Sequence, residues 1–177
     1  MARRKARELA FQTLFKSARG NNPLLEVWAE SRAEIMQQLQ AEGQAERLQQ
    51  KLREGMRSQR STLSEDGEQD AYGERLDQSS VDFADRLLRH YDAHHEHIDT
   101  TLAAAIEGWD FNQMAQTDLT VLRLALTEFL FEHDVPREVT TEMAVRIAKK
   151  FGSEESGRFV NGVLAKLFTS HVEVAGQ

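Results

Sequence analysis

Aromatic, cationic and small side chains gather around one turn near the carboxyl end of this chain. Gly152 is placed to end one helix in a left-handed conformation, and Ser153 can cap the next helix. Phe159 and Arg158 lie near the start of that second helix, where free backbone N–H groups attract anions. A ring beside a cation can stack a base and hold a phosphate, and Lys150 adds charge before the turn. Spacing alone also fits Phe159 as a core residue.

The amino end of the chain is strongly basic. The first 19 residues hold six Lys or Arg side chains and one acid, whereas the whole chain has a formal net charge of −7. A basic arm on an acidic body is typical of an anion-binding patch, although a solubilising terminus has the same composition. We predict RNA phosphate contacts from Arg3, Arg4, Lys5 and Arg7. Four contacts correspond to a salt slope of about −2.8 on single-stranded RNA.

Residue types that support catalysis or metal binding give weaker signals. The chain has no cysteine, so thiol nucleophiles, disulfides and thiolate metal sites are excluded. The glycines near the carboxyl-terminal turn have the spacing of a phosphate loop, but no Lys-Ser/Thr pair follows them. His90, His94 and His97 share one helical face, which fits either a metal or pH-sensing cluster or a solvated surface. We predict a protein that is not an enzyme and has no metal or cofactor.

The elements that must position these groups are helices. Charged residues make up 29% of the chain and β-branched runs are scarce, which favours long helices over sheet. The segment 119–131 is apolar nearly all round and should be the buried centre. Arg123 inside it needs an acidic partner, with Glu128 among the candidates. Expected helix caps are Asp118, Thr140 or Thr141, and Ser79 or Ser80.

The expected organisation is one all-α domain over residues 1–177, with two small helical sub-bundles that share a core. Residues 43–80 differ because they are polar. We expect the second helix to run into this insertion, with a break at Gly43, before a mobile loop over 58–73. No apolar run is long enough to span a membrane, and the amino end lacks an apolar signal core. These features favour a cytoplasmic protein.

Several short segments follow one family pattern: Val121-Leu122-Arg123-Leu124-Ala125, Glu128, Asp134-Val135-Pro136, Ala148-Lys149-Lys150-Phe151-Gly152 and Phe159-Val160-Asn161-Gly162-Val163-Leu164. With the basic run over residues 3–12, they resemble the NusB family of bacterial transcription antitermination factors. The resemblance covers roughly residues 2–20 and 81–167. Thr127 stands where the family commonly has an aromatic, and Glu142-Met143 where it commonly has Asn-Glu, which concerns packing more than RNA binding.

The resemblance implies a function as an RNA-binding adaptor. Such proteins bind single-stranded boxA RNA of ribosomal RNA leaders, jointly with the ribosomal protein NusE, and enter an RNA polymerase antitermination complex. By this likeness the basic arm, Glu155 and Phe159 become RNA contacts, and Phe15 and Asp118 face NusE. Two alternatives remain: an RNA-binding module related to ribosomal RNA cytosine methyltransferases, or a protein-only helical scaffold. The sequence leaves the oligomeric state open, including a homodimer.

Overall fold

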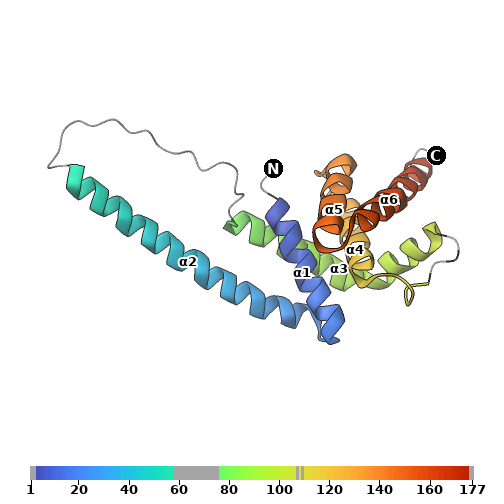
Figure 1. The fold of residues 1–177 in the computed structure, drawn as a ribbon, viewed down its shortest axis with the longest axis horizontal. Coiled ribbons are helices and arrows are strands. Elements are labelled where there is room, and N and C mark those ends of the chain that lie inside the picture. The colour runs from blue at the N-terminus through green and yellow to red at the C-terminus, as the bar shows by residue number, and fades with distance from the viewer. Residues whose placement is uncertain (1–2, 58–75, 107, 109, 176–177) are drawn as a thin grey trace.

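The structure is a computed structural model that describes residues 3–57, 76–106, 108 and 110–175. Within these ranges the chain forms six helices and no strand (Figure 1), which confirms the predicted all-α fold. The helices are α1 (Arg4–Gly20), α2 (Leu24–Arg57), α3 (Gln78–Ala105), α4 (Gln116–Phe131), α5 (Arg137–Phe151) and α6 (Glu154–Ala175). None of the described helices is both long enough and apolar enough to cross a bilayer.

Helix α4 forms the centre of the fold. It contacts α1, α3, α5 and α6, and Leu122 and Leu126 are completely buried. A helix surrounded on several sides has no polar face to solvate, which explains why its sequence is apolar nearly all round. Since α4 meets both α1 and α5, it fixes the relative positions of the basic arm and the carboxyl-terminal turn.

Helix α2 is much longer than the body it starts from. Its first turns bury Leu24 and Trp28, whose indole N–H donates to Asp85 on α3 at 2.7 Å. The helix then continues through Gly43 without a break and extends away from the other helices (Figure 1). Leu48 and Leu52 on this part are 60% and 59% exposed. The predicted break is therefore wrong, and the predicted loop over 58–73 lies outside the described residues.

The ends of α4 and α5 differ from the predicted caps. Helix α4 begins at Gln116, so Asp118 lies inside its first turn and does not cap it. Helix α5 begins directly after Pro136, whose φ of −60° suits a helix entry. Thr140 is then inside the helix, where its hydroxyl donates to Glu128 at 2.6 Å. The Thr140 hydroxyl, which was predicted to cap α5, is therefore hydrogen-bonded to the buried Glu128 carboxylate on α4 instead.

Helix α3 is capped by Asp77 rather than by Ser79 or Ser80. The Asp77 carboxylate accepts the backbone N–H of Ser80 at 2.8 Å and both serine hydroxyls, which makes it the shared acceptor of the helix start. Farther along, His94 has non-helical angles (φ −127°, ψ 15°), so α3 is two helical stretches joined at a kink.

Candidate nucleic-acid interface

The turn between α5 and α6 does not contain a left-handed residue at Gly152. Gly152 has φ −116° and ψ −113°, so the predicted left-handed conformation is wrong. A glycine is needed here because a Cβ atom would lie 2.7 Å from the Ser156 hydroxyl and 2.8 Å from the Ala148 carbonyl oxygen. The predicted cap at Ser153 is confirmed, since its hydroxyl accepts the Ser156 N–H at 3.1 Å.

Arg7 is not part of any exposed surface. Its side chain is in the core, 5% exposed, and its guanidinium donates to both carboxylate oxygens of Glu128 at 2.7 and 2.9 Å. It also lies 5.2 Å from the centre of the buried Phe83 ring. The prediction that Arg7 contacts RNA is therefore wrong, because an arginine with a buried acidic partner cannot reach a phosphate without unfolding the site.

The other cations of the arm remain accessible. Arg3 pairs with the exposed Asp134 at 3.2 Å and lies over Phe83, and Arg4 pairs with Glu8 at 3.3 Å. Lys5 is exposed and has no ion-pair partner among the residues described. Exposed ion pairs contribute little to stability and are easily exchanged for another anion. Three of the four predicted arm residues are therefore accessible at the surface.

Glu8 connects the arm to the carboxyl-terminal turn. Its carboxylate accepts from Arg4 on its own helix and from the Lys150 ammonium at the end of α5, at 2.7 Å. Burial of the Glu8 carboxyl opposes ionisation, but hydrogen bonds and charges from Lys150 and Arg4 outweigh it and lower the pKa. Two predicted RNA contacts from distant parts of the sequence thus share one carboxylate.

An aromatic row continues from this cluster along α1. The Phe11 ring lies 4.8 Å from that of Phe151 and 5.7 Å from that of Phe15, measured between centres. Lys150 lies over Phe151, and Arg19 lies over Phe15 at 5.8 Å. Phe15, predicted to face a protein partner, is half-buried at the end of this row.

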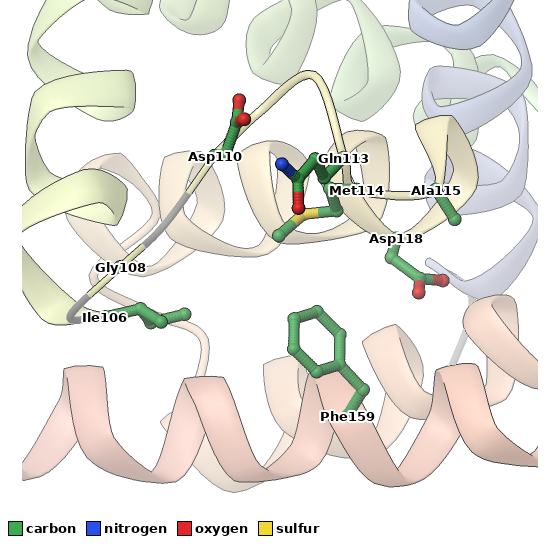
Figure 2. Close-up of a pocket in the computed structure, with 8 residues that line it drawn as sticks. All are labelled: Ile106, Gly108, Asp110, Gln113, Met114, Ala115, Asp118 and Phe159. Atoms are coloured by element: carbon green, nitrogen blue, oxygen red, sulfur yellow. The ribbon is translucent and has the colours of Figure 1, made fainter.

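Phe159 and Asp118 line one pocket of about 360 Å³, between α6 and the segment that leads into α4 (Figure 2). Phe159 is 39% exposed, so it is not a core residue. Asp118 is 9% exposed, and in the described part of the chain its Oδ1 atom has no hydrogen-bond partner. The remaining described lining residues include a second acid, Asp110, and no Lys or Arg. The pocket is therefore an acidic site with an aromatic wall.

The structure thus places in two different sites residues that were all predicted to contact RNA or its partner. Arg4 and Lys150 meet at Glu8, whereas Phe159 lines a pocket with Asp118 in which the described lining residues are not cationic. Glu155 and Arg158 are exposed on the first turns of α6. The sequence predictions also missed Arg146 and Lys149, which line a groove of about 370 Å³ between α1 and α5 with Arg4 and Lys150. Both residues lie on the outward face of α5, and this position, together with their charge, could have identified them as candidate RNA contacts.

Two other predicted groups have structural partners. Arg123 donates to both carboxylate oxygens of Asp99 on α3, at 2.8 and 2.7 Å, rather than to Glu128, which Arg7 occupies. His90 and His94 stack on the Phe131 ring with centres 4.8 and 4.6 Å away. Over the described residues, no group of three or more His, Cys, Asp or Glu side chains has the geometry to hold a metal ion.

The sequence is similar to a known protein family and to several of its members. Residues 53–168 match the model of the NusB family. The transcription antitermination protein NusB of Thermus thermophilus is 42% identical over 94% of this chain and 89% of its own length. That of Deinococcus deserti is 42% identical over 95% of this chain and 81% of its own.

Solved structures have the same fold. The T. maritima NusB structure is 28% identical with a TM-score of 0.65, and the match covers 93% of this chain and 89% of that one. A crystal structure of antitermination factors NusB and NusE in complex with dsRNA gives a TM-score of 0.67 over 96% and 97% of the two chains. Its identity of 18% makes it a likeness of fold alone.

Proposed function

This chain belongs to the NusB family, and from that premise we propose that it binds RNA jointly with a NusE protein in transcription antitermination. The named relatives are transcription antitermination proteins, and the solved neighbour holds NusE and RNA together. The more specific proposal is that the RNA is the boxA segment of ribosomal RNA leaders and that the assembly joins RNA polymerase. A homodimer is not required, since both binding surfaces lie on one chain.

The RNA surface of this proposal consists of exposed cations of α1 and of the α5–α6 turn. The observation that carries it is the cluster of Arg4, Glu8 and Lys150, which brings the two ends of the chain onto one surface. Three arm contacts, without Arg7, correspond to a slope of log K against log salt of about −2.1 on single-stranded RNA. The arm residues are Arg3, Arg4 and Lys5, joined by Lys150 and Arg158.

The protein-partner surface consists of the Asp118 pocket and the end of the aromatic row at Phe15. A buried carboxylate oxygen without a donor is costly, and a donor from a partner would relieve that cost. The acidic lining favours a basic or amide group of a protein over a phosphate. Phe159 and Glu155 are proposed as RNA contacts at the edge of this surface, where the two ligands would meet.

A titration with single-stranded boxA RNA at low salt, with and without NusE, tests joint binding. We expect NusE to raise RNA affinity, and equal affinity in both series would contradict joint binding. R4A/K5A should weaken RNA binding, while R89A/R137A, which removes two exposed and ion-paired arginines that are not among the proposed RNA contacts, is the matched control. Duplex RNA of the same sequence tells whether unpaired bases are needed.

Phe159→Ala separates stacking from packing. If Phe159 stacks a base, RNA affinity falls by about 1–3 kcal/mol, with little change in the free energy of unfolding. A loss of stability of about 3 kcal/mol or more would instead assign Phe159 to the core. Its exposure of 39% favours the first outcome. Urea denaturation and RNA titration on the same preparation distinguish them.

A further inference from the structure

The groove between α1 and α5 shares Arg4 and Lys150 with the proposed RNA surface and contains further side chains that this surface does not include. It encloses about 370 Å³ and is lined by Arg4, Glu8, Met143, Arg146, Ile147, Lys149 and Lys150. Four of these side chains are cationic and one is a carboxylate. The groove is therefore electropositive even though the chain as a whole is acidic.

The floor of the groove is apolar. Ile147 is buried at the bottom, and Met143 is half-buried one turn before it on α5. Both side chains line the cavity, so a ligand that passes the charged rim meets hydrocarbon and a polarizable thioether on the floor. A free anion would not use such a floor, whereas the flat face of a nucleobase would.

The rim cations are held out of the floor by local contacts. Arg146 pairs with Glu142 at 2.7 Å, and Lys149 pairs with Glu154 at 2.9 Å. The Lys149 stem lies against Gly157 of α6, where a Cβ atom would come within 2.6 Å of its Cγ. These ion pairs are largely exposed and therefore weak, so both cations can turn to a phosphate at little cost.

The opposite rim of the groove is Arg4, one of the arm cations. An RNA strand that follows Arg3, Arg4 and Lys5 therefore continues directly into the groove without leaving positive surface. We propose that the groove holds one nucleotide of the bound RNA, with its base against Met143 and Ile147 and its phosphates at Arg146 and Lys149. This site rests on the proposed RNA function and adds to it two cations and a base contact.

The phosphate part is tested by R146A/K149A, with R89A/R137A as control because it removes the same charge from exposed ion pairs. Binding of an oligouridine 12-mer is titrated over a range of salt. Two lost phosphate contacts should reduce the slope of log K against log salt by about 1.4, while the control leaves it unchanged. Equal slopes for the two double variants would overturn the groove site.

The base part is tested with Met143→Ser and two probes, the oligouridine and an abasic ribose-phosphate chain of equal length. The variant should lose affinity for oligouridine and keep that for the abasic chain. If it loses neither, or both equally, the base does not lie on this floor. An oligoglutamate that binds the wild type and not R146A/K149A, with RNA affinity unaffected, would assign the groove to an acidic peptide.

The two failures are distinguishable. If the wild-type chain binds no RNA, the proposed function fails and the groove site falls with it. The groove site alone fails if three results occur together: the wild type binds RNA, R4A/K5A weakens that binding, and the groove variants behave like the control. Circular dichroism of each variant shows that the fold is retained, which is expected because the side chains removed in R146A/K149A are exposed.

Discussion

The Arg7–Glu128 pair is the most constrained ion pair among the described residues. Glu128 accepts two hydrogen bonds from Arg7 and one from Thr140, and both charged side chains are almost fully buried. The sequence held a signal for this burial, because Phe11 and Leu14 follow Arg7 at helical spacing and form the apolar stripe of α1. Arg7 was nevertheless predicted to be exposed because it belongs to a basic run, and composition does not tell which cation of such a run faces inward.

Arg7→Ala should therefore destabilise the protein strongly. It leaves the Glu128 carboxylate buried without its cation, which costs about 3–5 kcal/mol. Arg4→Ala is the control, since its partly exposed pair with Glu8 should contribute about 1 kcal/mol or less. Urea denaturation followed by circular dichroism measures both, and similar losses for the two variants would contradict the buried pair.

Glu8 predicts a pH dependence of stability. Its pKa is lowered in the folded chain from an ordinary value of 4.5, because Lys150 and Arg4 favour the ionised carboxylate against the opposing effect of burial. A lowered pKa stabilises the fold above the ordinary value, and this contribution is lost as the pH falls through the folded value. The stability difference between wild type and Glu8→Gln should hold from neutral pH to about 5 and then shrink in more acidic buffer. A constant difference would show that Glu8 does not titrate as described.

At the scale of elements, hydrophobic periodicity predicted the helices well and their ends poorly. The periodic stripes that bury α1 and α3 are visible in the sequence because each of these helices turns one face to the core, and α4 is visible because it is apolar nearly all round. The caps failed where side chains found tertiary partners, as Thr140 did at Glu128, or where a better acceptor lay nearby, as Asp77 did before Ser80. Which hydrogen-bond partner a capping side chain finds thus depends on residues distant in sequence, or on a shift of the helix start by a few residues.

The pocket beside α4 could not be predicted for the same reason. The sequence predicted that Phe159 contacts RNA, as the basic arm does, whereas in the structure Phe159 shares a cavity with Asp118, between α6 and the chain segment that leads into α4. Family likeness named both residues but not their shared pocket. The groove between α1 and α5 likewise needs the packing of two helices whose sequences are separated by most of the chain.

Gly152→Ala should destabilise the α5–α6 turn. The new methyl group would meet the Ala148 carbonyl oxygen and the Ser156 hydroxyl at distances no real Cβ adopts, so the backbone must shift, at a cost of about 1–3 kcal/mol. Gly162→Ala is the matched control on α6: no atom lies within 4 Å of its Cβ position, and helix propensity predicts a gain of about 0.5–1 kcal/mol. Thermal denaturation should move the two variants in opposite directions.

At the scale of the whole molecule, the cationic surface and the Asp118 pocket lie on one body with α4 as its common support. A body of this kind can couple two ligands without a large rearrangement, provided that the ligands also touch each other or bias the same state. The proposed positions of RNA and NusE meet near Phe159 and satisfy that condition.

Reciprocal coupling is the expected outcome. Whatever factor NusE adds to RNA affinity, RNA must add to NusE affinity, because the coupling free energy belongs to the pair. Calorimetric titrations in both orders measure the two factors. Asp118→Asn should weaken NusE binding and leave RNA affinity unchanged when NusE is absent. A loss of RNA affinity without NusE would place Asp118 on the RNA surface instead.

The length of α2 has a consequence for how the molecule moves in solution. At 34 residues the helix is about 51 Å long, whereas a compact chain of this size has a radius of gyration of about 16 Å. Rotational diffusion is then slower about axes perpendicular to that rod than about the rod itself. Amide relaxation rates along α2 should reveal the anisotropy, and frictional drag should exceed that of a sphere of equal mass.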